Sequence, residues 1–174
     1  MQRILEKEDP VLREKAEEID VSEYGSNWLT DLANNMISIM KEMGAVGVAA
    51  PQIGVSKRVI VFGTNYTKSR KIDIPIPDTV LINPSLKILS EEIQTGYEGC
   101  LNCGELRGEV PRAMEIEYSG YDLQGTFFSK LASGLEARIV QHEIDHLNGI
   151  LFFDHVKDKD TLITASELLS RSPS

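Results

Sequence analysis

The stretch QHEIDHL, residues 141–147, contains the pattern H-E-x-x-H. On a helix, His142 and His146 would lie about 40° apart around the axis and about 6 Å apart along it. Two imidazoles at that spacing can bind one metal ion, and Glu143 would stand beside the ion without binding it. There Glu143 can take a proton from metal-bound water, as in metallohydrolases. Because the chain has only three histidines and two occupy this pattern, we prefer a metal site to two histidines merely packed on an apolar face.

The residues around this stretch predict a largely buried helix from about Ser133 to Gly149. Ser133 and Glu136 have the spacing of a capping box, and Gly149 is placed to end the helix. The apolar residues that share or widen the histidine face are Leu135, Ile139, Val140, Ile144 and Leu147. We therefore expect both histidines to point toward other elements of the fold.

A second helix is predicted over residues 27–43, where apolar side chains recur at three- and four-residue steps. Ser26 or Asn27 can cap its start, and Gly44 is placed to end it. The apolar stripe consists of Trp28, Leu29, Leu32, Met36, Ile39, Met40 and Met43.

Short β-like runs predict strands over residues 58–62, 79–83, 113–118 and 125–128. Between the first two, the polar residues 65–78 carry two prolines and predict an exposed loop. Helix, strands and helix in this order predict an α+β fold, with mixed or antiparallel sheets packed around the central motif helix.

No repeat or linker composition divides the chain, so we expect a single domain over residues 1–174, with a short tail at 155–174. The net charge of −9 does not suit a protein that binds nucleic acid, which needs a basic face. The N-terminus is charged and no apolar run reaches the roughly 18 residues of a membrane span. We therefore expect a cytoplasmic protein that contacts neither nucleic acid nor membrane.

A catalytic metal needs a third protein ligand and one open position. Asp154, His155 and Glu167 follow the motif, but none has a supporting pattern. Cys100, in the run EGCLN at residues 98–102, is the better candidate. Its thiolate would complete a His₂Cys site.

Three blocks of the chain together resemble the three signatures of the peptide deformylase family. They are GVAAPQ at residues 47–52, EGCL at 98–101 and QHEIDHL at 141–147, and the run LRGEVPR at 106–112 also looks like the family. The resemblance extends from about residue 4 to residue 156. It implies the α+β arrangement predicted above and the removal of the N-formyl group from the initiator methionine of nascent polypeptides, with release of formate.

Carried over residue by residue, the resemblance implies three metal ligands: Cys100, His142 and His146. It implies Glu143 as the general acid and base, with the Gln52 side chain and the Leu101 backbone N–H binding the formyl oxygen. Fixed donors aimed at a developing oxyanion lower the barrier to hydrolysis. The family's single divalent ion is ferrous iron physiologically, with zinc, nickel or cobalt as substitutes.

The resemblance also implies how the substrate, an N-formylmethionyl peptide, is bound. The peptide lies like an added strand along backbone near Val46, Gly47 and Gly99. Its methionine enters an apolar pocket to which Leu135 and Ile139 contribute. Some relatives contact the ribosome transiently through a basic C-terminal helix, but the tail of this chain is short and charge-balanced, so we predict no strong docking by that route.

The chain departs from the family pattern at three places. Ala45 stands where the family usually has glycine, and an alanine would be strained if that position needs a positive φ. Asn102 replaces a usual serine, and Cys103-Gly104 replaces an aliphatic residue and proline. These changes spare every implied ligand.

Three other hypotheses use the same residues. Cys100, Cys103, His142 and His146 could together form a closed structural zinc site, which would make the protein a binding module. A metallopeptidase could use the motif helix on internal peptide bonds. The C-x-x-C pair could do redox work, although no thioredoxin-like βαβ context surrounds it.

Overall fold

The computed structural model describes residues 3–67 and 72–171 of the chain. In these residues the α-helices are α1 (Asn27–Met43), α2 (Gly134–Leu147) and α3 (Ala165–Arg171). The strands are β1 (Gly47–Ala49), β2 (Val59–Phe62), β3 (Thr79–Ile88), β4 (Ile93–Glu98), β5 (Leu106–Ala113), β6 (Glu115–Tyr121), β7 (Phe127–Ser133) and β8 (Ile163–Thr164). Short 3-10 helices occupy Pro10–Arg13, Val21–Glu23, Ala50–Ile53, Leu101–Cys103, Phe152–Asp154 and Lys159–Thr161.

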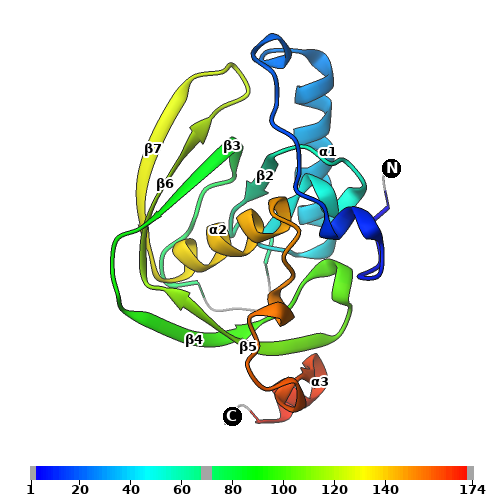
Figure 1. The fold of residues 1–174 in the computed structure, drawn as a ribbon, viewed down its shortest axis with the longest axis vertical. Coiled ribbons are helices and arrows are strands. Elements are labelled where there is room, and N and C mark those ends of the chain that lie inside the picture. The colour runs from blue at the N-terminus through cyan, green and yellow to red at the C-terminus, as the bar shows by residue number, and fades with distance from the viewer. Residues whose placement is uncertain (1–2, 68–71, 172–174) are drawn as a thin grey trace.

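The strands form two antiparallel sheets around α2. The larger sheet has the order β1-β2-β3-β6-β7 and the smaller one the order β4-β5-β8. Figure 1 shows α2 crossing the middle of the molecule, with β3, β6 and β7 on one side, α1 on the other, and β4 and β5 below it. This arrangement confirms the predicted α+β fold with antiparallel sheets around α2.

The larger sheet is covered on both faces near β2. Ile60 and Phe62 pack with α2 in one core cluster, whereas Val59 and Val61 pack with α1 in another. Successive side chains of a strand point to opposite faces, so one short apolar strand can join both clusters. As a result α2 is held between the two sheets, with its histidine face directed away from the larger one.

The first helix has the predicted bounds. The Ser26 side chain accepts a hydrogen bond from the Leu29 N–H, and Gly44 ends the helix in the left-handed conformation at φ +62°. Five of the predicted stripe residues are buried: Leu29, Leu32, Met36, Ile39 and Met40. Trp28 and Met43 lie at the helix ends and are 45% and 55% exposed, so the predicted stripe was too wide.

The capping box predicted for α2 does not form. Ser133 precedes the helix but makes no side-chain capping bond, and Gly134 supplies the turn with φ +57°. Glu136 instead accepts hydrogen bonds from the Tyr118 hydroxyl at 2.8 Å and from Lys130 Nζ at 2.7 Å. Contacts with β6 and β7 therefore replace the expected local cap.

The four predicted strands exist but three are displaced or longer. β3 extends to Ile88, β6 begins only at Glu115, and β7 covers 127–133 instead of 125–128. The four strands of the described residues that sequence patterns missed are β1, β4, β5 and β8. In the predicted loop at 65–78, residues 68–71 lie outside the described part of the chain. Its second half is anchored, because buried Ile76 donates its N–H to the Thr64 hydroxyl at 2.8 Å.

The C-terminal residues, expected to form a tail, belong in part to the smaller sheet. β8 pairs antiparallel with the start of β5, and α3 follows it directly. Among the described residues, no helix is both long and apolar enough to span a membrane.

Candidate active site

Two imidazoles project from one face of α2. The rings of His142 and His146 lie with their centroids 5.0 Å apart and their planes at 73°. His146 is buried, and burial lowers the pKa of its ring well below the usual value. The ring is therefore neutral at physiological pH, which is the form that binds metal ions.

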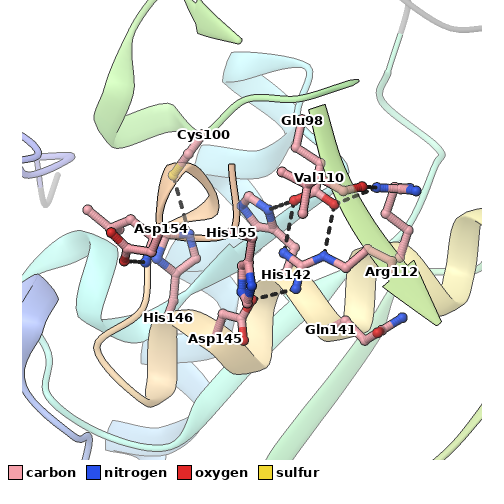
Figure 2. Close-up of polar contacts among 12 residues, drawn as sticks. Glu98, Cys100, Val110, Arg112, Gln141, His142, Asp145, His146, Asp154 and His155 are labelled. Atoms are coloured by element: carbon pink, nitrogen blue, oxygen red, sulfur yellow. Dashed lines mark hydrogen bonds and ion pairs between the residues drawn. The ribbon is translucent and has the colours of Figure 1, made fainter. Parts of the chain in front are cut away.

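The third candidate ligand comes from the turn after β4. Cys100 has extended backbone and directly precedes the 3-10 helix Leu101–Cys103. Its Sγ lies 3.3 Å from His146 Nε2. Figure 2 shows Cys100 above the two histidines, and one ligand atom from each of the three residues lies within 4.8 Å of the others. The turn after β4 thus brings Cys100 close to α2, although β5, β6 and β7 lie between them in the sequence.

These donors fit a catalytic divalent ion. One thiolate and two imidazoles give three protein ligands, which leaves a fourth position for water or substrate. A hydrogen bond with Cys103 and burial both raise the pKa of the Cys100 thiol when no ion is present. A bound cation acts in the opposite direction because it favours the thiolate. Cys103 itself is buried but lies outside the group of three.

Glu98 orients the first histidine. Its Oε2 lies 2.8 Å from His142 Nδ1, which leaves Nε2 as the ring nitrogen available for an ion. The same carboxylate accepts hydrogen bonds from Arg112 at 2.9 and 3.0 Å and from Arg138 at 2.8 Å. Burial alone would raise the pKa of Glu98, but the hydrogen bonds from His142 and Arg112 outweigh it and lower the pKa well below its usual range.

The ionic network continues behind this carboxylate toward the surface. Arg112 Nη1 lies 2.5 Å from Asp145 Oδ2, and the same oxygen lies 2.8 Å from His155 Nε2 (Figure 2). Arg112 and Arg138 carry two positive charges and Glu98 only one negative charge. Asp145, which pairs with Arg112, supplies the second negative charge. None of these partners was predicted from the sequence, although Glu98 and Asp145 stand inside the motif blocks.

Glu143 lies beside the candidate ligands and is not part of the group whose atoms could share one ion. Its side chain is buried, and its Oε2 has no hydrogen-bond partner among the described residues. Burial raises the pKa of this carboxyl to about 7. Gly47 packs directly against it: a Cβ added to Gly47 would lie 2.7 Å from Glu143 Cδ. The carboxyl is therefore both unpaired and poised to exchange a proton near neutral pH.

The Gln52 side chain enters the site from the 3-10 helix Ala50–Ile53. Its Oε1 accepts the Ala49 N–H at 2.7 Å. Its Nε2 donates to Cys100 Sγ at 3.1 Å and to Asn102 Oδ1 at 2.7 Å. Asn102 in turn donates to the Leu5 carbonyl at 2.6 Å. The amide of Gln52 is thus fixed with its nitrogen toward the candidate ligands.

A cavity of about 610 Å³ opens onto this centre. Cys100, His142 and Glu143 line it, and so do six residues for which a role in binding was predicted: Val46, Gly47, Gln52, Gly99, Leu101 and Ile139. Leu135 is not part of the lining; it is partly buried against the core cluster between α2 and the larger sheet.

The remaining candidates have other partners. Asp154 pairs with Arg13 and Glu167 with Thr164, while His155 pairs with Asp145. Ala45 does not have a positive φ, since Asn83 is the one non-glycine residue with that conformation in the described ranges. The strain considered for Ala45 is therefore absent.

The fold and this centre are those of a metal-dependent hydrolase of the α+β class, with three candidate protein ligands and a neighbouring carboxyl group. A family model described as polypeptide deformylase matches residues 1–161. The chain belongs to the peptide deformylase family, which implies a divalent metal.

Individual relatives agree with this assignment. Peptide deformylase 1 of Nitrosomonas europaea is 39% identical over 155 residues, covering 89% of this chain and 87% of the relative. The class I type b peptide deformylase of Acinetobacter baumannii, solved with Met-Ala-Ser bound, superposes with a TM-score of 0.82 at 38% identity, covering 87% of this chain and 96% of that one. Peptide deformylase 1B of Arabidopsis thaliana, solved with an inhibitor, gives 0.79 at 35% identity, covering 90% and 82%.

The family membership decides among the hypotheses drawn from the sequence. The chain is a hydrolase, and the alternative of a structural zinc module is not favoured. The geometry points the same way, because Cys103 stands outside the group that can share an ion.

Proposed function

We propose that this chain hydrolyses the formyl group from peptides that begin with formylmethionine, with Cys100, His142 and His146 holding one ferrous ion. Water is added across the formyl amide, the C–N bond breaks, and formate and a free amino terminus are released. The strongest support is that Cys100 and His142, an unpaired carboxyl and a fixed amide donor line one cavity, with His146 grouped beside the first two.

The divalent ion supplies a Lewis acid that makes water a stronger nucleophile at neutral pH. Thiolate and imidazole donors suit ferrous iron, and also zinc, nickel and cobalt. We assign ferrous iron as the physiological metal and the others as substitutes.

Glu143 is the proton carrier in this proposal. In its ionised form it takes a proton from the attacking water, and Oε2, which has no other partner, can hold that proton. The protonated carboxyl then gives it to the leaving nitrogen, so the amine departs neutral. Burial raises the pKa of this carboxyl in the protein without an ion, which strengthens it as the base that takes the proton from water.

Gln52 and Leu101 stabilise the charge that develops on the formyl oxygen. Gln52 Nε2 already points at Cys100 Sγ, next to the reacting position, and Leu101 offers its backbone N–H from the following residue. Two fixed donors on one oxygen are the usual means of lowering the barrier to acyl transfer.

The substrate backbone lies along Val46, Gly47 and Gly99, and the methionine side chain enters the cavity beside Ile139. The relative solved with Met-Ala-Ser supports a peptide ligand of this kind. Leu135 does not line the cavity. It packs against the core cluster that contains Ile139 and so supports the methionine pocket indirectly. Because new polypeptides are the substrate, we place the protein in the cytoplasm, with at most a transient ribosome contact.

The test uses protein prepared without oxygen and loaded with ferrous iron. We expect formate release from formyl-Met-Ala-Ser, none from acetyl-Met-Ala-Ser, and no cleavage of internal bonds in an unstructured protein. Glu143→Ala is the matched variant: it should keep its iron and lose at least about 10²-fold in activity. Internal cleavage without formate would move the chain to the peptidase hypothesis, and loss of iron from Glu143→Ala would show that Glu143 is a ligand.

A further inference from the structure

The cavity at the metal centre has a wall that comes from the C-terminal end of the chain. Leu106 pairs with Thr164 and Arg107 with Ile163 where β8 joins β5. The Ala165 N–H donates to the Glu105 carbonyl at 2.9 Å. These bonds attach β8 and the start of α3 to the β4–β5 strand pair, at the end where β4 leads to Cys100 (Figure 1).

The start of α3 is also fixed. Glu167 accepts hydrogen bonds from the Thr164 N–H at 2.7 Å and hydroxyl at 2.8 Å, and its own N–H donates to that hydroxyl at 3.2 Å. Reciprocal bonds of this kind set the direction in which a short helix leaves its strand. The side chains of α3 therefore have a defined position relative to the smaller sheet.

Three α3 residues line the cavity onto which Cys100 and His142 also open: Ala165, Leu168 and Leu169. Residues 43–47 also line this cavity. Leu168 is half-buried, whereas Leu169 is 75% exposed beside the cavity. A large exposed apolar side chain at the edge of a ligand cavity can contact an apolar group of the ligand.

We infer that Leu168 and Leu169 select among the residues that follow methionine in the formylated peptide, favouring an apolar side chain there. This inference rests on the proposed function. A cavity of about 610 Å³ holds more than one side chain. Successive side chains of an extended peptide point to opposite faces, so those after methionine cannot all follow it into the pocket at Ile139. The cavity is continuous from Cys100 and His142 to α3. The side chains that follow methionine can therefore reach the apolar wall formed by Leu168 and Leu169.

The test compares kcat/KM for formyl-Met-Leu-Leu, formyl-Met-Ser-Ser and the short substrate formyl-Met-Ala. The iron-loaded protein should prefer the Leu-Leu peptide to the Ser-Ser peptide. The double variant Leu168→Ser, Leu169→Ser should lower that preference roughly five- to tenfold, the low end for an apolar contact, and leave formyl-Met-Ala unchanged. Leu169→Ser alone should lower it in part, and since this side chain is exposed the single variant should fold normally.

Leu131→Ser is the matched control, because Leu131 is 68% exposed on β7 and does not line the cavity. An unchanged preference in Leu169→Ser and in the folded double variant would overturn the inference, as would an equal loss on all three peptides. If the unaltered protein released no formate from any peptide, the proposed function would fail instead.

Discussion

The Nε2 of Gln52 lies 2.7 Å from the Oδ1 of Asn102, and both side chains are buried. This bond uses one of the two amide hydrogens, so the other is held toward Cys100 Sγ, 3.1 Å away. Asn102 is itself tied to the Leu5 carbonyl. Asn102 therefore determines which way the proposed oxyanion donor points.

Substitution of this pair should show that the two residues act as a unit. Gln52→Leu removes the donor and should lower kcat by roughly 10²–10³ with little change in KM. Asn102→Ala leaves the donor but frees its orientation, so we expect about a tenfold loss in kcat with metal content unchanged. The double variant should be no worse than Gln52→Leu alone, which a double-mutant cycle of kcat measures. Additive losses would mean that Asn102 acts on something other than Gln52.

The raised pKa of Glu143 predicts a pH dependence of stability in protein stripped of metal by a chelator. Its usual pKa is 4.5 and the folded value is about 7, so between these pH values the folded protein holds a proton that the unfolded chain has released. The contribution of Glu143 to the free energy of unfolding should therefore fall as pH rises through this window, by an amount on the order of 3 kcal/mol, while His146, whose pKa is lowered, acts in the opposite direction.

Glu143→Gln cannot titrate and should abolish that fall, as denaturant unfolding between pH 4.5 and 7 would show. Glu98 does not interfere, because its pKa is lowered and its contribution is lost only as the pH drops below the usual value of 4.5. The same slope in the variant and the unaltered protein would place the titrating group elsewhere.

Glu98→Gln should weaken metal binding indirectly, because Glu98 contacts the proposed ligand His142 and is not itself a proposed ligand. Glutamine keeps the shape of the side chain but cannot neutralise Arg112 and Arg138, which both bond to Glu98. Removing one partner of a buried ionic group costs roughly 3–5 kcal/mol of stability. Loss of the His142 contact should reduce metal affinity by about 10- to 100-fold, measured by competition with a chelator. Glu109→Gln, on an exposed position of β5, is the control. Unchanged metal affinity in Glu98→Gln would show that His142 is oriented by other contacts.

The two cysteines should behave differently. Cys100→Ala should abolish metal-dependent activity because it removes a ligand. Cys103 packs with Val110, Phe152 and Val156, so Cys103→Val fits an apolar site and should keep full metal occupancy and most activity. Metal analysis and formate release on both variants give the answer. Equal loss of metal from the two variants would restore the four-ligand hypothesis.

Local patterns predicted the parts of the fold that depend on local contacts. The periodicity of residues 27–43 and the spacing of His142 and His146 depend on helix geometry alone, and both helices form where predicted. The third candidate ligand was different: Cys100 was preferred because no residue after the motif had a supporting pattern, and the resemblance to a family signature then implied it. No spacing rule links it to a helix some 40 residues away.

The parts that were missed depend on contacts distant in sequence. β5 carries Arg107, Glu109 and Arg112, which look like surface charges, yet Arg112 is buried because Glu98 and Asp145 neutralise it. Glu136 has the spacing of a capping residue but binds Tyr118 and Lys130. The pairing of β8 with β5 joins residues more than 50 positions apart and leaves no local signal.

Gly47 contributes no functional group, yet it sets a limit on how the chain can change. A single methyl group there would collide with the carboxyl of Glu143, which would have to leave its buried position. In a saturation mutagenesis screen scored by cell growth, position 47 would be as intolerant as the ligand positions, although any variant there could still fold and retain metal. Such a screen would score Gly47 as essential because the absence of a side chain there leaves room for the carboxyl of Glu143.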